Sequence, residues 1–222
     1  MSGMTRADYR IGIWAATSGA VLIALYVLVG LIGVATRPPS TNPLSQVDPC
    51  LAVLEALLSL VALDLVILMS AVYAYATPDR KTFALAAVAF VVAFAILTCS
   101  VHFASLTVGR QLAPTASPLL HRQLSFGEWP SLALCADLLA WDFFLGMSLM
   151  MAAQVFKSPG LKGGVRWSMI VAGTLCLAGT LGPATGQLHI QYFGIAGYSC
   201  VLPVVCTLLA ILFRAERDSQ PN

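Results

Sequence analysis

Six long apolar runs occupy most of this 222-residue chain, and they constrain its fold more than any other feature. A membrane-spanning helix needs roughly 20 mainly apolar residues to cross a hydrocarbon layer about 30 Å thick. The runs cover 11–36, 50–77, 82–109, 131–156, 167–181 and 190–213. Because backbone polar groups in lipid must be satisfied within the protein, each run is expected to be a helix. The sequence predicts an all-α, polytopic membrane bundle of six transmembrane helices, forming one integral membrane domain over residues 1–222.

The composition agrees with a membrane protein rather than a soluble domain. Hydrophobic residues make up 59% of the chain and charged residues only 10%, which is outside the usual range of soluble globular proteins. The formal net charge is +2, which does not suggest a nucleic-acid partner. The lipid bilayer is therefore the expected environment. The fifth run is the least regular, because Pro183 and several glycines interrupt it in "GTLGPATG".

The basic residues predict an orientation. The first run has 26 uncharged residues, and "LIGVATRPPS" is a poor cleavage site, so it is expected to be retained as a helix rather than removed as a signal peptide. With six spans, nine Lys or Arg residues fall on the side of the two termini and three on the other side. Cytoplasmic loops carry the excess of Lys and Arg. Both termini are thus expected in the cytoplasm, and the location is the cytoplasmic membrane if the source is bacterial.

An internal echo links the second and fourth runs. "ALDLVILMSAVYAYATPDRK" and "AWDFFLGMSLMMAAQVFKSPG" share Ala-x-Asp, four residues, then Met-Ser. Their aspartates, Asp64 and Asp142, lie 13 residues before Thr77 and 14 before Phe156, which places both near the middle of the bilayer. Each run is followed by a short basic turn and another apolar run. The pattern indicates a weak parallel repeat of helical hairpins.

These two aspartates are the leading candidate site residues. A carboxylate in the membrane interior costs about 2.5 to 3.5 kcal/mol on insertion scales, so it normally faces other helices and has a partner. No Lys or Arg lies within any of the six runs, so at least one aspartate is expected to be protonated at neutral pH. A protonated Asp64 or Asp142 could act as a general acid. Alternatively, each could simply hydrogen-bond a neighbouring backbone, or Ser70 or Ser148, and hold helices together.

Other polar residues gather in the half of the bundle remote from the termini. On a regular helix Asp137 lies about 7.5 Å from Asp142 and is rotated by roughly 140°, so these two cannot share one narrow face. Glu55 is interpreted mainly as a solvated interfacial group, and His102 is expected near the same interface. His102 and His189 could alternatively approach each other as haem ligands or quinone contacts.

Several chemistries lack their motifs. The six cysteines include no CxxC pair, and the chain has no GxSxG, HExxH, Walker A or aspartate-rich diphosphate motif. No metal and no cofactor are therefore expected. Trp141 and Phe144 flank Asp142, and aromatic faces beside a proton donor suit a developing carbocation. In its size and its intramembrane carboxylates, the chain is distantly similar to the compact membrane-bound terpenoid cyclases.

The preferred hypothesis is a membrane-embedded enzyme that protonates, cyclises or isomerises an apolar, isoprenoid-like small molecule. Asp64 or Asp142 would be the general acid and Asp137 a supporting carboxylate. The substrate site would be lined by Trp141, Phe144, Glu55, His102 and His189. One alternative is a proton-coupled transporter of a small solute, in which the aspartates relay protons. Another is a non-catalytic subunit whose aspartates meet a membrane protein partner, and a haem or quinone protein is a fourth.

Overall fold

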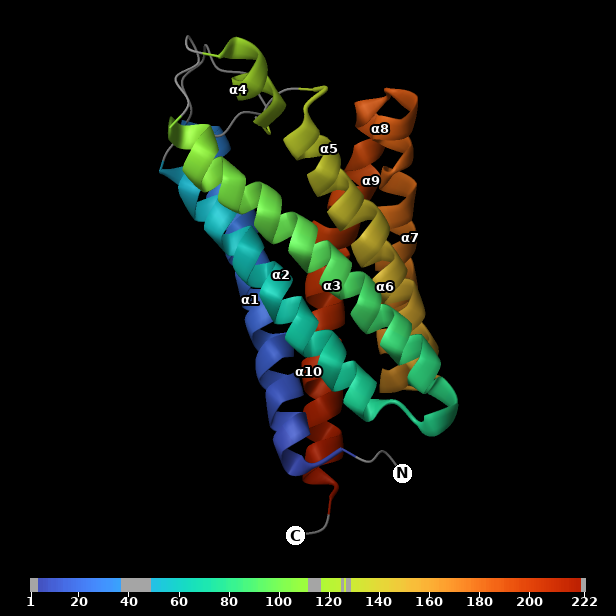
Figure 1. Ribbon diagram of the computed structural model, residues 1–222. Coiled ribbons are helices and arrows are strands. Elements are labelled where there is room, and N and C mark those ends of the chain that lie inside the picture. The colour runs from blue at the N-terminus through green and yellow to red at the C-terminus, as the bar shows by residue number, and fades with distance from the viewer. Residues whose placement is uncertain (1–3, 37–48, 112–116, 125, 127–128, 221–222) are drawn as a thin grey trace.

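A computed structural model describes residues 4–36, 49–111, 117–124, 126 and 129–220, and within these ranges all regular structure is helical. Six helical stretches are long and apolar enough to cross a membrane. The prediction of an all-α, six-span bundle is therefore confirmed, and the chain is an integral multi-pass membrane protein. Figure 1 shows both termini at one end of the bundle, called the terminal end below, and α4 at the other, called the distal end.

The first three spans are long and nearly continuous. They comprise α1 (Arg6–Thr36), α2 (Cys50–Tyr75), and a third span built from η1 (Pro78–Arg80), α3 (Lys81–Ala104) and η2 (Ser105–Gly109). A short helix, α4 (Pro118–Leu124), lies at the distal end before the fourth span (Figure 1).

The last three spans are divided into more segments. The fourth consists of α5 (Leu132–Leu138), η3 (Leu139–Phe144), α6 (Leu145–Ala152) and η4 (Ala153–Val155). The fifth consists of α7 (Leu161–Gly179) and α8 (Leu181–Thr185). The sixth consists of η5 (Leu188–Ile190), α9 (Gln191–Ala196), η6 (Gly197–Val201) and α10 (Leu202–Asp218).

The fifth span differs from its predicted limits at both ends. It begins at Leu161, directly after Gly160 with φ of 76°, and not at Trp167. Lys162 and Arg166 lie in its first turns, where long basic side chains can reach water from a helix end. Pro183 does not end the helical stretch, because it is the third residue of α8. In a first helical turn the missing N–H of proline leaves no bond unmade.

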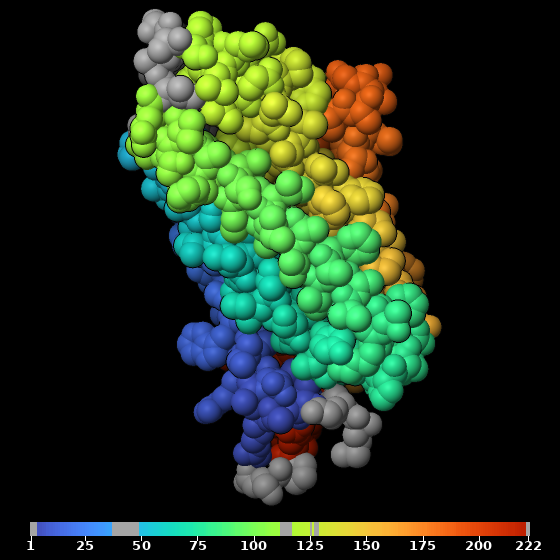
Figure 2. Space-filling view, viewed as in Figure 1, coloured from blue at the N-terminus to red at the C-terminus, as the bar shows by residue number. Residues whose placement is uncertain are grey.

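The helices pack in a closed order. α1 contacts α2 and α10, α2 contacts α3, α3 contacts α6, and α6 contacts α7, which in turn contacts α9 and α10. Large side chains such as Leu65, Phe94, Leu145, Met169 and Phe213 are fully buried between them. Figure 2 shows α3 and α2 covering one face, with α1 extending beyond them at the terminal end. Many outward apolar side chains remain exposed, as lipid-facing surfaces require.

Three spans contain a π-helical turn. These turns are η2, η3 and η6. π-Helical turns are rare in proteins, but many of those that occur lie at functional sites. The turn in the sixth span ends two residues before Pro203, which has no N–H to donate to a carbonyl of that turn, so the position of the turn has a local cause. η2 begins at Ser105 and η3 begins two residues after Asp137, so both adjoin the polar cluster described below.

The two halves of the sequence echo have different surroundings. Both hairpins turn at the terminal end (Figure 1), as the echo requires. Ser70 is exposed and donates to Val66 O of its own helix, whereas Ser148 is buried and donates to Ala87 O of α3 at 2.8 Å. The parallel repeat therefore stays a prediction, and the equivalent residues Ser70 and Ser148 make different contacts.

Candidate functional site

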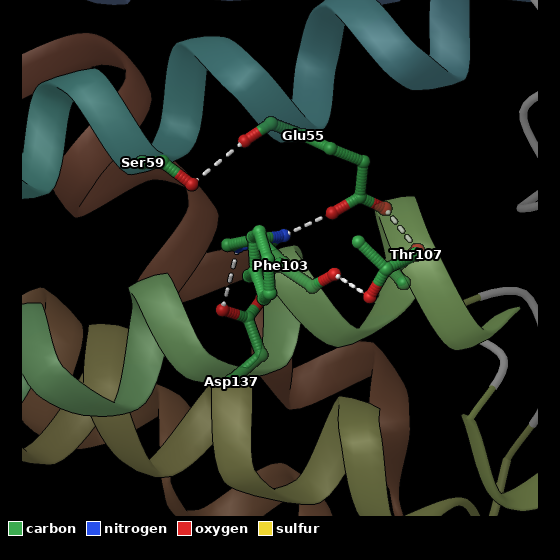
Figure 3. A network of polar contacts seen from close by, with 7 residues as sticks. Glu55, Ser59, Phe103, Thr107 and Asp137 are labelled. Carbon is green, nitrogen blue, oxygen red and sulfur yellow. Dashed lines mark hydrogen bonds and ion pairs between the residues drawn. The ribbon is translucent and has the colours of Figure 1, made fainter.

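A buried histidine lies between two carboxylates in the distal half of the bundle. His102 of α3 directs Nδ1 at Glu55 Oε2 of α2 in a short contact, and Nε2 lies 3.2 Å from Asp137 Oδ1 of α5. Ser105 Oγ donates to the other Glu55 oxygen at 2.9 Å. Figure 3 shows Glu55 and Asp137 on opposite sides of this network, projecting from different helices. We call Glu55, His102, Ser105 and Asp137 the distal cluster.

Burial of the distal cluster corrects one sequence interpretation. Glu55 and His102 were expected to be solvated near an interface, but only 3% and 2% of their surfaces are exposed. The ring of Phe126 stacks on the His102 imidazole with centroids 5.1 Å apart. A carboxylate and an imidazole are both costly to bury alone, and each provides the other with a partner.

The two contacts of His102 are not equivalent. Nδ1 hydrogen-bonds Glu55, but Nε2 and Asp137 Oδ1 meet only the distance of an ion pair and lack hydrogen-bond alignment. An imidazolium can donate from both nitrogens, whereas a neutral ring donates from one and accepts at the other. The cluster can therefore hold its protons on the ring or on a carboxyl group. This arrangement is suited to moving a proton between helices.

Asp142 occupies a second buried site on the same span as Asp137. It lies in η3, is fully buried, and accepts a 3.2 Å hydrogen bond from Gln191 Nε2 of α9. A Cβ at position 194 would lie 2.2 Å from Asp142 Oδ1, and one at 179 would lie 3.0 Å from it. Glycine at these two positions lets the carboxyl group fit between α7 and α9. Among the described residues, Asp142 Oδ2 and Gln191 Oε1 have no hydrogen-bond partner.

The structure does not bring Asp64 and Asp142 together. Asp64 lies between α2 and α1, where Ser18 Oγ donates to its Oδ1 at 2.6 Å. A Cβ at Gly19 would approach Asp64 Oδ2 to 2.8 Å, so this glycine also makes room for a carboxyl group. Asp142 contacts α7 and α9 instead. The sequence prediction of one site containing both aspartates therefore has no contact that supports it.

Trp141 is buried among other aromatic rings. Its ring meets Phe94 edge-on at 4.8 Å and Tyr198 of η6 at 5.1 Å. With Tyr26, Leu58 and others it lines a small cavity of about 10 Å³, which is room for about one water molecule. Trp141 is therefore buried inside the bundle and does not face lipid, and its place in a substrate site stays a prediction.

Phe144 and His189 lie outside these contacts. The Phe144 ring packs against neighbouring Phe143 at 5.4 Å and is only partly buried. His189 lies in η5, near the distal end of the sixth span, and is exposed. Both ring nitrogens of His102 face carboxylates, which leaves neither for a haem iron. Among the described residues, no three His, Cys, Asp or Glu side chains are arranged to hold a metal ion.

Sequence reasoning missed two kinds of contributor. Ser105 and Gln191 supply donors to carboxylates, and glycines 179 and 194 supply the space around Asp142. One signal was present in the sequence, since Glu55, His102 and Asp137 each lie within about two turns of the distal end of their runs. Equal depth indicated that they could meet, but not that they would face each other.

The fold and the site together define a multi-span membrane protein with buried carboxylates. Comparison of the chain with models of protein families, with curated proteins and with solved structures gives no match. The argument for function therefore depends on the geometry described above.

Proposed function

We propose that this protein is a membrane-embedded acid–base enzyme that isomerises or cyclises an apolar, isoprenoid-like alkene. The observation that carries the proposal is His102 between a buried carboxylate, Glu55, and a partly buried one, Asp137, with the buried Asp142 five residues further along the span of Asp137. Such groups can exchange protons in a site from which bulk water is excluded, where their electrostatic effects are strong.

Asp142 is assigned the role of general acid. As a neutral carboxylic acid, it would donate its proton to one carbon of a carbon–carbon double bond, leaving a carbocation on the other carbon. The faces of Trp141 and Tyr198 would stabilise that cation by cation–π attraction. Asp137 would then remove a proton from a neighbouring carbon, which re-forms a double bond at a new position and completes an isomerisation.

The distal cluster would return the enzyme to its starting state. The proton gained by Asp137 passes to His102, whose position between two carboxylates allows it to hold a proton. Re-protonation of Asp142 from the cluster closes the cycle, with no net gain or loss of protons. Glu55 and Ser105 act as positioning residues, because they fix the imidazole and do not reach the substrate.

Substrate entry is assigned to the side of α1. The most apolar part of α1 is only 17% buried, against 33 to 50% for the other spans. Tyr26 of α1 lines the small cavity beside Trp141. Separation of α1 from α2 would therefore enlarge this cavity towards the lipid, from which an apolar substrate would arrive.

Deuterium incorporation tests the enzyme proposal directly. Membranes containing the protein would be supplied with a panel of isoprenoid alkenes in D₂O, and extracted lipids would be analysed by mass spectrometry. Donation by a solvent-exchanged acid adds one deuterium to the product. Asp142→Asn should reduce product by about 100-fold or more, the usual contribution of a general acid. Asp64→Asn removes the carboxyl group that lies between α1 and α2, and this variant should retain activity.

Two results would contradict these assignments. Unchanged product formation by Asp142→Asn excludes that residue as the acid. Equal loss in Asp142→Asn and Asp64→Asn, with both proteins folded, indicates that the position of Asp142 beside the distal cluster has no special role.

Proton-coupled transport is a second candidate, and one observation favours it. Glu55, His102 and Asp137 form a series of titratable groups in contact across α2, α3 and the fourth span, and Asp142 is buried five residues further along that span. Series of this kind relay protons in membrane transporters. Solute uptake into proteoliposomes under an imposed pH gradient tests this function, and His102→Gln should abolish such uptake.

A further inference from the structure

A polar cavity of about 380 Å³ lies at the terminal end of the bundle, whereas the distal cluster lies in the opposite half. Its walls come from the end of α2, the η1 turn, the segment between η4 and α7, and the end of α10. They are formed by Tyr75, Thr77, Asp79, Arg80, Val155, Lys157, Ser158, Lys162 and Glu216. Its volume is within the range of small-molecule sites.

The charges around this cavity do not cancel. Arg80 pairs with Asp79 at 2.9 Å, and Lys162 pairs with Glu216 at 2.7 Å. Lys157 is exposed, and no described residue forms an ion pair with it. Three cations and two carboxylates leave an excess of one positive charge. A ligand that carries one negative charge would balance it.

Glu216 is bound by residues other than Lys157. Glu216 accepts from Tyr75 Oη at 2.8 Å and faces Tyr9 Oη at 3.5 Å, besides its pair with Lys162. Its charge is thus engaged by three neighbouring helices and is not available to Lys157. Lys157 and the neighbouring Ser158 both line the cavity, and Lys157 forms no ion pair with a described residue.

We propose that this cavity binds a phosphate group of single negative charge, supplied by an anionic phospholipid headgroup or by a free phosphate ion. Arg and Lys side chains form strong, charge-assisted bonds with phosphate oxygens. The cavity lies where the second, third, fourth and fifth spans begin or end, which is the level of lipid headgroups. Basic pockets between membrane helices bind such headgroups. This site is separate from the proposed enzyme site and does not depend on it.

Native mass spectrometry of the purified full-length protein tests the proposal. The probes are phosphatidylglycerol, zwitterionic phosphatidylcholine and inorganic phosphate. Wild-type protein should retain one phosphatidylglycerol in preference to phosphatidylcholine. Lys157→Gln should weaken that binding about fivefold, which corresponds to one basic contact at a membrane surface. Lys157→Arg, which keeps the charge, should restore it.

A charge-matched control removes a cation outside the cavity. Arg214 of α10 is exposed, lies at the same end, and does not line this cavity. Arg214→Gln should leave phosphatidylglycerol binding within about twofold of wild type, because a cation that does not line the cavity forms no direct bond with a phosphate oxygen there. Equal weakening by Arg214→Gln and Lys157→Gln would overturn the proposal, because general attraction would then explain binding.

The three probes distinguish the two sources of phosphate. Selective retention of phosphatidylglycerol that inorganic phosphate does not displace assigns the site to a lipid headgroup. Binding of inorganic phosphate that depends on Lys157, without selective lipid retention, assigns it to a free phosphate ion. Absence of both forms of binding in the folded wild-type protein refutes a phosphate site in this cavity.

Discussion

Replacement of Gly194 by alanine tests how tightly the Asp142 carboxyl group is enclosed. The new Cβ would lie 2.2 Å from Asp142 Oδ1 and 3.1 Å from Gln191 Nε2, so the side chains must move. Overpacking of this kind costs typically about 1 to 3 kcal/mol. Loss of the 3.2 Å bond from Gln191 to the carboxyl group adds about 1 to 3 kcal/mol.

The helical propensity of alanine offsets part of this cost. Alanine is more favourable than glycine inside a helix by roughly 1 kcal/mol. We therefore expect Gly194→Ala to lower the free energy of unfolding by about 1 to 5 kcal/mol, the net of these three contributions. The measurement is reversible unfolding in mixed micelles with increasing denaturing detergent.

Gly30→Ala is the matched control. Gly30 lies in α1, and a Cβ there would meet no atom within 4 Å. The same substitution should therefore leave stability unchanged or raise it by up to about 1 kcal/mol. Asp142→Ala in the Gly194→Ala background should show strong non-additivity, because removal of the carboxyl group relieves the clash. Wild-type stability of Gly194→Ala would refute the enclosed geometry of Asp142.

Two further substitutions address other buried contacts. Ser18→Ala removes the 2.6 Å donor of Asp64 and should lower the free energy of unfolding by about 1 to 3 kcal/mol, whereas Ser70→Ala, on an exposed face, should change it by less than about 0.5 kcal/mol. Glu216→Gln breaks the 2.7 Å pair with Lys162 at the terminal end and should lower it by about 1 kcal/mol. The Glu216 effect should shrink in high salt, and a salt-independent loss would exclude an ionic contribution.

The number and type of spans could be predicted from hydropathy, because the bilayer sets a minimum apolar length for each helix. Span ends were less certain, as the fifth span shows. The prediction began the fifth span at Trp167, after the basic residues Lys162 and Arg166. In the structure α7 begins at Leu161, since a helix can extend into the polar layer when its basic side chains reach water.

The candidate site was only partly predictable. Asp142 and Asp137 stand out in the sequence because carboxylates are conspicuous in an apolar run, and both contact other helices, but their roles stay predictions. The burial of Glu55 and His102 could not be predicted, because hydropathy defines depth in the membrane but not the rotation or neighbours of each helix. Those neighbours depend on packing, which places His102 of α3 between α2 and α5.

The relation between Asp137 and Asp142 shows how local helical winding changes a site. On a regular α-helix the two residues point roughly 140° apart, which suggests that they face different neighbours. The π-turn η3 begins at Leu139, between them, and its i→i+5 bonds place more residues in each turn. Five residues then come closer to one full turn, which reduces the angle between the two side chains. The two carboxyl groups still face different helices, because Asp137 lies beside His102 of α3 whereas Asp142 accepts a hydrogen bond from Gln191 of α9.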